Sequence, residues 1–356
     1  MDLAGRFDVG LIMGSEAPGQ TKAEAARIEL DRITRIRDAL NDKKLVVVIG
    51  AGVTLNVTAS QSGKTLDRLS WLGLIRHGLN YLVKDDYIDK DDYRLRYAQE
   101  ILDLYPGDLL EAARVLRALL DEARQFPTWL KAVFGGLSKE VRHRALLDVL
   151  KSLHERGAML LTTNYDDLFE EGYCELRRIS RSNHDDLLKF QSGELRGILH
   201  VHGSYHDPAD VIIDATDYEN VQSSDIKTVL RTLWNTYTIL FVGCGSGLED
   251  PNFGALLQWA CDDQKNISNR HCVLLKTGDP FNPKPLVRLK FGPNYSDLVP
   301  YLQRLLSEQE TDDPIDATAP SGAEANWWIG NGKAQTFLRA LGKLWNATSC
   351  GMARER

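Results

Sequence analysis

Three short apolar runs in this chain end directly in glycine or polar residues, and this feature constrains the fold more than any other. The ends of the runs read Gly50-Ala51-Gly52, Asn164-Tyr165-Asp166 and His202-Gly203. Buried parallel strands have near-continuous apolar sequences, and open α/β sheets bind ligands beyond the carboxyl ends of such strands. The sequence therefore predicts an α/β protein with a mainly parallel sheet, whose functional residues follow the ends of its strands.

Apolar spacing predicts the other elements. A helix is expected at 21–41, where Thr21 and Glu24 form a capping-box pattern. Further helices are expected at 71–83, from Asp108 onward, through Leu168 and Phe169, at 226–236 and up to Leu305. Strands are expected at 44–49, 159–162, 198–202, 211–213, 238–242 and 272–276. Together these elements predict a doubly wound, Rossmann-like sheet with a helical insertion over 72–150.

Changes in composition predict the domain boundaries. Residues 1–41 form an amino-terminal arm and helix, and residues 42–306 form the main domain. Residues 307–322 are acidic and rich in Pro, Ala and Ser, which is typical of a linker. Apolar residues return in 323–356, where Trp327, Trp328 and Phe337 indicate a tail with a short helix.

The overall composition is that of an ordinary globular protein, with 43% hydrophobic and 26% charged residues. The net charge is −7 and no dense basic run occurs, so neither a nucleic-acid partner nor an anionic membrane is expected. The amino terminus lacks the pattern of a signal peptide, and no apolar run approaches transmembrane length. The five cysteines are scattered. They read as reduced thiols, and we expect a cytoplasmic or nuclear protein.

The glycines after the first strand have two interpretations. Gly50 and Gly52 can let backbone amides approach a pyrophosphate, or they can simply form a tight turn. A dinucleotide fingerprint requires a third glycine where Leu55 stands, and the β-branched residues of 53–58 make a poor helix start. A P-loop at Gly63-Lys64-Thr65 is excluded because Thr58 occupies the place of its first glycine.

The polar residues after the other two strands suit several kinds of chemistry. A histidine such as His202 suits the role of general base, and the Asn164 amide can orient a water or a ribose hydroxyl. Asp166 or Asp167 can alternatively cap a helix, since aspartate is common at that position. On the expected strand, His200 and His202 share one face. With His206 and Asp207 they leave a zinc site open as an alternative.

The order of these motifs resembles that of zinc-less sirtuin-like NADases over about residues 44–305. The shared features are the Gly-Ala-Gly loop, a Thr-x-Asn-x-Asp motif and His-Gly, in that order. The chain is most similar to sirtuin-like NADases of microbial antiviral defence and to a filament-forming animal pair. The phrases that carry this similarity are Thr-Thr-Asn-Tyr-Asp, Leu-His-Val-His-Gly, Val-Gly-Cys-Gly and Asn-Tyr-Ser-Asp-Leu.

The resemblance implies a set of functional residues. His202 and Asn164 would be catalytic. The residues that would contact NAD are Gly50, Ala51, Gly52, Thr54, Asp166, Gly243, Cys244, Gly245 and Ser246. No metal is expected, because the cysteines cannot form the four-cysteine zinc module of lysine-deacylating sirtuins. The Asp-Phe-Arg motif of those enzymes is also absent, and Thr163 replaces their glutamine.

The expected function is cleavage of NAD to nicotinamide and ADP-ribose, in innate immune or antiviral defence and with activation by self-assembly. NAD, further copies of the chain in an oligomer or filament, and a related paralogue are the expected partners. The alternative is a non-catalytic protein that binds NAD or ADP-ribose and serves in signalling or as a scaffold. A protein deacylase is a weaker alternative.

Overall fold

The computed structural model describes residues 22–307, except for 61, 105–107, 172–173, 215–216, 218–224, 246–247, 249–253, 255–256 and 258–269. The predicted arm over 1–20, the tail over 323–356 and nearly all of the linker lie outside the described residues. Thr21 and Ser246 also lie outside them.

Within the described residues, seven strands form one sheet in the order β3-β4-β2-β1-β5-β6-β7, and every neighbouring pair is parallel. The strands are β1 (Leu45–Ile49), β2 (Met159–Thr162), β3 (Arg178–Ser180), β4 (Ile198–His200), β5 (Thr238–Val242), β6 (Cys272–Leu275) and β7 (Val287–Lys290). This confirms the predicted parallel, Rossmann-like α/β fold.

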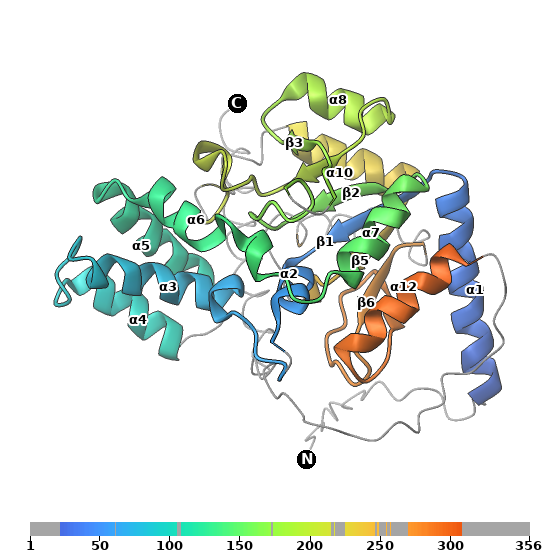
Figure 1. Ribbon diagram of the computed structural model, residues 1–356, viewed down its shortest axis with the longest axis horizontal. Coiled ribbons are helices and arrows are strands. Elements are labelled where there is room, and N and C mark those ends of the chain that lie inside the picture. Colours follow the sequence, from blue (N-terminus) through green and yellow to red (C-terminus); the bar gives the residue numbers. More distant parts are fainter. Residues whose placement is uncertain are drawn as a thin grey trace, which may run out of the picture.

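Helices cover both faces of this sheet (Figure 1). Leu45, Val47 and Ile49 of β1 share one core with α1 (Lys22–Asn41), α2 (Ala51–Thr58), α7 (Ala145–Glu155) and α12 (Leu298–Leu306). Val46 and Val48 share the opposite core with α8 (His184–Ser192) and α10 (Asp225–Thr236). Because both faces of β1 are covered, each of its residues is buried, which explains its uninterrupted apolar sequence.

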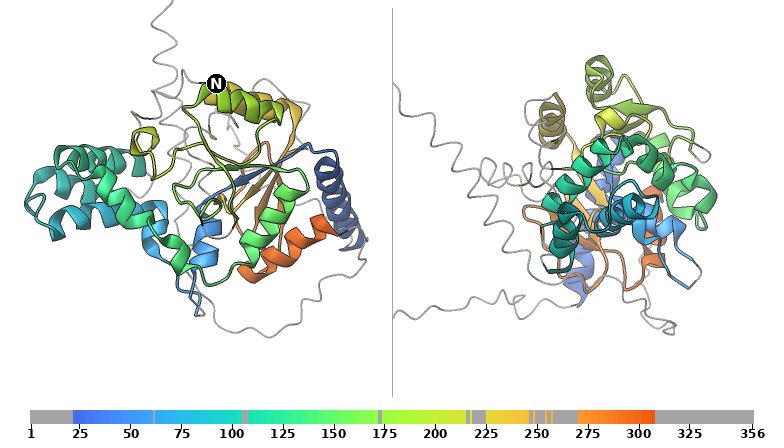
Figure 2. Two further views of the ribbon diagram at one scale, coloured as in Figure 1. Left: turned by 45° about the horizontal axis from the view of Figure 1, so that its top comes forward. Right: turned by 90° about the vertical axis from the view of Figure 1, so that its left-hand side faces the viewer.

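Between β1 and β2 the chain forms a group of helices that extends to one side of the sheet (Figure 2). These helices are α3 (Trp71–Lys84), α4 (Tyr93–Leu104), α5 (Leu109–Glu122) and α6 (Phe126–Phe134). Ser70 caps α3 by accepting a hydrogen bond from the Gly73 amide. Short 3-10 turns are η1 (Asp67–Leu69), η2 (Leu137–Glu140), η3 (Pro208–Asp210) and η5 (Tyr295–Asp297). Among the described helices, none has both the length and the apolarity that a membrane span needs.

The strand order places a topological switch point at β1 and β5. The chain leaves β1 toward β2 on one side of it, and leaves β5 toward β6 on the other. In open α/β sheets the crevice for a ligand forms at such a point, outside the carboxyl ends of the strands. A ligand crevice is therefore expected at the loops after β1 and β5.

Two local predictions, for residues 53–58 and 211–213, were wrong. α2 begins directly at Ala51 in spite of its β-branched residues, because Val53, Leu55 and Val57 are buried in the core. Tertiary packing thus overrides a weak intrinsic propensity. Residues 211–213 are not a strand, although all three are buried, and the Ile212 amide donates to the His202 carbonyl.

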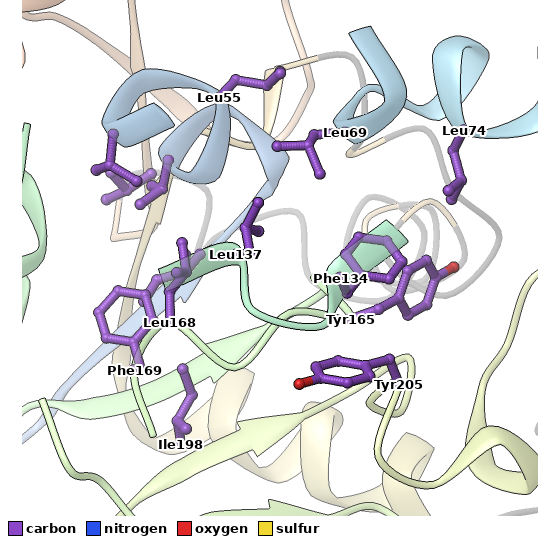
Figure 3. Packing of buried hydrophobic residues seen from close by; sticks show 14 of the residues in the cluster. Leu55, Leu69, Leu74, Phe134, Leu137, Tyr165, Leu168, Phe169, Ile198 and Tyr205 are labelled. Atoms are coloured by element: carbon purple, nitrogen blue, oxygen red, sulfur yellow. The ribbon is translucent and has the colours of Figure 1, made fainter. Parts of the chain in front are cut away.

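The loop after β2 also differs from prediction. Residues 163–167 form no helix, and a turn follows at 168–170. Its backbone instead bonds to the end of β1 and to the loop after β4, with the Thr163 amide donating to the Ile49 carbonyl and the Tyr205 amide donating to the Tyr165 carbonyl. Leu168 and Phe169 are buried in the same core as Ile198 (Figure 3). Their apolar character therefore reflects core packing of a loop, not the face of a helix.

Candidate functional site

The loops after β1, β2, β4 and β5 meet at the carboxyl edge of the sheet, as the sequence motifs predicted. Strand register fixes this meeting, because Ile49 pairs with Thr162 and with Val242, and Thr162 pairs with His200. The residues that follow these four strand ends are therefore brought close together although they are far apart in the sequence.

The two glycine loops pack directly on one another. The Gly50 amide donates to the Val242 carbonyl at 3.0 Å, and the Gly52 amide donates to the Gly243 carbonyl at 2.8 Å. A Cβ atom on Gly52 would lie 2.7 Å from the Gly243 oxygen, which is too close for any side chain. Gly243 itself has φ +69°, a conformation that favours glycine. These glycines allow close loop packing, and the amides of Gly50 and Gly52 are already used within the protein.

Asn164 is held by its side-chain nitrogen. Its Nδ2 donates to the Gly50 carbonyl at 3.2 Å and to Thr54 Oγ1 at 2.9 Å. The Gly50 carbonyl can only accept a hydrogen bond, so the amide nitrogen must face it and the side-chain orientation is fixed. Asn164 Oδ1 then points away from these partners. It is buried, and none of the described residues donates a hydrogen bond to it. A buried acceptor in this condition is suited to a ligand hydroxyl or a water.

Asp166 continues the same network. Thr54 Oγ1 donates to Asp166 Oδ2 at 2.7 Å, and the Leu168 amide donates to Asp166 Oδ1 at 3.3 Å. Burial raises the pKa of Asp166 to about 6, although the Thr54 and Leu168 hydrogen bonds oppose that shift. Asp166 can therefore change its charge in the range just below neutral pH.

The three histidines have different surroundings. His200 ends β4 and is buried, with Nδ1 3.1 Å from the Asn164 carbonyl and Nε2 2.6 Å from Glu170 Oε1. His202 is also buried, but it lies in the turn after β4, so the prediction that both share a strand face was wrong. Gly203, with φ +80°, reverses the chain at this turn.

The structure does not bring the four predicted zinc ligands, His200, His202, His206 and Asp207, into one group. Among the described residues, the group that could share one ion is Asp167, Glu171 and His206. Asp167 Oδ2 already accepts from Tyr205 Oη at 2.6 Å and lies 2.9 Å from His206 Nε2. These hydrogen bonds account for the cluster without an ion.

Aromatic packing ties the Asn164 loop to the loop that follows His202. Phe134, at the end of α6, has its ring centroid 5.7 Å from that of Tyr165 and 6.3 Å from that of Tyr205 (Figure 3). Tyr165 Oη donates to the Ile212 carbonyl at 2.6 Å. The helices between β1 and β2 are thus in direct contact with both loops of the site.

Comparison with known proteins finds two similarities. The sequence model of the SIR2-like domain matches residues 158–295. The chain is also 27% identical over 144 residues to defense-associated sirtuin 2 of Bacillus subtilis, a match that covers 38% of this chain and 14% of that protein. Both similarities support a sirtuin-like family. The chain thus spans a small part of the length of that relative. Neither similarity supports the filament-forming animal pair in particular.

The matched region contains part of the candidate site. It includes Asn164, Asp166, His202 and the loop after β5, whereas the Gly50–Gly52 loop lies before it. Of the sequence-predicted residues, the structure joins Gly50, Thr54, Asn164 and Asp166 in one hydrogen-bond network. Cys244 is buried beside this network, with its Sγ 3.5 Å from the Val48 carbonyl.

Sequence reasoning missed Glu170 and the aromatic residues that support the loops. Tyr165 and Tyr205 lie inside or beside the motifs. Their phenol groups were the sequence feature that could have indicated hydrogen bonds between the loops. Glu170 offers no such signal, because a glutamate six residues after Asn164 resembles any surface carboxylate. Only the fold shows that its side chain is 8% exposed and faces His200.

Proposed function

We propose that this protein hydrolyses NAD to nicotinamide and ADP-ribose. The observation that carries the proposal is Asn164 Oδ1, a buried acceptor to which no described residue donates a hydrogen bond. Asn164 is linked through Thr54 to Asp166, beside the loop that follows β1 at the topological switch point. The support for NAD as the ligand is the similarity to the SIR2-like domain, since sirtuin-like proteins use this molecule.

The proposed chemistry follows from the charges and donors of the site. Departure of nicotinamide leaves positive charge on the ribose, and the ionised Asp166 together with the side-chain oxygen Oδ1 of Asn164 would stabilise that charge. His202 would remove a proton from the attacking water or from a ribose hydroxyl. The positioned groups would lower the barrier mainly by holding NAD and the acceptor in reactive geometry.

The phosphates and the adenosine would lie along the glycine loops. α2 begins at Ala51, and a helix amino terminus favours a phosphate. Gly52, Gly243 and Cys244 would contribute shape, because the Gly50 and Gly52 amides donate to protein carbonyls.

A role in antiviral defence is part of the proposal, since the similar Bacillus protein is a defense-associated sirtuin. We further propose that activity depends on self-assembly of the chain. Sizing at several protein concentrations, with specific activity measured at each, tests this. A fully active monomer contradicts the assembly part and leaves the hydrolase proposal intact.

The test of the function is to incubate the purified chain with a series of NAD concentrations and to separate the products by chromatography. We expect nicotinamide and ADP-ribose in equal amounts. Tight NAD binding without product favours the signalling or scaffold alternative. Nicotinamide release that requires an acyl-lysine peptide favours the deacylase.

A further inference from the structure

Two buried side chains, Glu170 and His200, hold the Asn164 loop at its backbone and have no role in the mechanism above. Glu170 Oε1 lies 2.6 Å from His200 Nε2, and His200 Nδ1 lies 3.1 Å from the Asn164 carbonyl oxygen. The side chains of His200 and Glu170 are 1% and 8% exposed. We propose that Glu170 and His200 are positioning residues, which together orient Asn164 toward the ribose of NAD.

Hydrogen-bond chemistry fixes where the protons of this pair lie. A carbonyl oxygen only accepts, so His200 Nδ1 must carry a hydrogen and donate it to Asn164. The contact between His200 Nε2 and Glu170 Oε1 needs one further proton between the two atoms. Both imidazole nitrogens are then engaged, and His200 has no free lone pair with which to act as a base.

The pair connects a rigid element to a loop. His200 is the last residue of β4, in the interior of the sheet, whereas Asn164 lies in a segment without regular structure. The Asn164 residue is bonded at its amide by Thr162 Oγ1, at its side chain by Gly50 and Thr54, and at its carbonyl by His200. Loss of the carbonyl contact would allow the peptide to rotate and would displace Oδ1, and small displacements of reacting groups are costly for catalysis.

Glu170 supports the histidine from a turn of the same loop, since its amide donates to the Asp167 carbonyl at 3.0 Å. A buried ion pair contributes little to stability on average, but removal of one partner leaves the other buried without compensation. Simple truncation therefore cannot separate a positioning role from a structural one. Variants that keep one contact and lose the other can.

His200→Asn and His200→Gln form such a matched pair. The asparagine amide takes about the place of imidazole Nδ1 and can still donate to Asn164, whereas the glutamine amide takes about the place of Nε2 and reaches Glu170 instead. Both remove an imidazole and leave one buried partner unpaired. We expect His200→Asn to retain at least about tenfold more kcat than His200→Gln, with similar KM for NAD, because displaced reacting groups can lose about 10²-fold in rate. Equal loss in the two variants overturns the proposal.

Glu170→Gln and Glu170→Ala give the second comparison. A glutamine amide can donate to Nε2 of the neutral imidazole, so Nδ1 still donates to Asn164 and kcat should stay within about threefold of the original. Glu170→Ala should lose about 10²-fold in kcat. If both variants lose activity equally, the pair does not act through geometry and the proposal fails. The proposal also fails if neither variant loses activity.

This inference rests on the proposed NAD hydrolysis, so one readout must be independent of turnover. The side-chain amide protons of Asn164, assigned by their loss in Asn164→Ala, should exchange slowly with solvent because they donate to Gly50 and Thr54. Their signals should shift and exchange faster in His200→Gln and Glu170→Ala, but not in Glu170→Gln. Unchanged signals in all variants contradict the positioning role. Absence of hydrolysis in the unmutated protein, with these shifts present, contradicts only the proposed function.

Discussion

The loops that follow β1 and β2 lie side by side at one edge of the sheet, yet they are held in opposite ways. The first packs by backbone contact, with Gly50 and Gly52 donating to the loop after β5. The second is held by side chains, and Asn164 keeps a buried acceptor that no described residue satisfies. A glycine motif at a strand end can thus serve to pack two loops together, while its less regular neighbour keeps the open acceptor to which we assign the chemistry.

The largest effect should come from His202, which we propose as the general base. General-base catalysis typically contributes about 10²–10⁴-fold, so His202→Ala should lower kcat by that range. The measurement is nicotinamide release at saturating NAD. His143→Ala, at an exposed position before α7, is the matched control and should retain full activity. If His200→Ala is more damaging than His202→Ala in a folded protein, the catalytic histidine has been assigned wrongly.

A substitution in the glycine loop should act on stability. Gly52→Ala places a Cβ atom against the Gly243 backbone, which cannot move aside, and we expect a loss of about 3 kcal/mol in the free energy of unfolding. Gly136→Ala is the control, because it introduces positive-φ strain without any contact within 4 Å, and should cost about 1 kcal/mol. Urea unfolding compares the two. A Gly52→Ala protein of normal stability would show that the loop packing is looser than described.

Asp166 should make stability depend on pH. Its pKa in the folded protein is about 6, above the ordinary 3.8, so the folded state keeps a proton that the unfolded chain has lost. The resulting stabilisation is complete below about pH 4 and is lost as pH rises through 6, a change of about 3 kcal/mol. Relative to Asp166→Asn, the unmutated protein should therefore lose stability between pH 4 and 8.

The comparison with Asp166→Asn isolates one group, because Asp210 and Asp217 also have raised pKa values and are present in both proteins. If the difference between the two unfolding free energies does not change with pH, Asp166 is not the titrating carboxyl.

The proposed mechanism needs the ionised form of Asp166. In the hydrolysis assay, activity should therefore fall below about pH 6.

The smallest effect should come from metal removal. The hydrogen bonds from Tyr205 and His206 to Asp167 account for the group that could hold an ion, and neither Asn164 nor His202 belongs to it. Dialysis against a chelator should leave nicotinamide release unchanged within error. Loss of turnover that added zinc restores would favour a metal-dependent mechanism.

The sequence was sufficient for the parts of the fold whose residues are buried on every side. The central strands β1, β2 and β5 are continuous apolar runs, and their prediction was confirmed. The edge strands β3 and β7 are short and partly exposed, so their sequences resemble loops, and they were missed. α4 was missed within the helical insertion because its apolar spacing is weak.

The candidate site was predictable as a set of motifs but not as a network. Asn164 and Asp166 stood out because they follow an apolar run, and the structure connects them through Thr54. Leu168 and Phe169 suggested a helix because burial alone does not distinguish a loop from a helix. The Glu170–His200 contact depends on where a turn places one carboxylate, and no local pattern encodes that placement.

The central claim, that the loop after β2 carries the chemistry, is tested most directly by Asn164→Ala. NAD binding should be measured by calorimetry and single-turnover hydrolysis by chromatography, with Asn80→Ala on the exposed surface of α3 as the control. We expect hydrolysis to fall by at least about 10²-fold while the Kd for NAD changes by less than about tenfold, because Asn164 Oδ1 would act on the reacting ribose. Hydrolysis at the original rate by a folded Asn164→Ala protein would contradict the account.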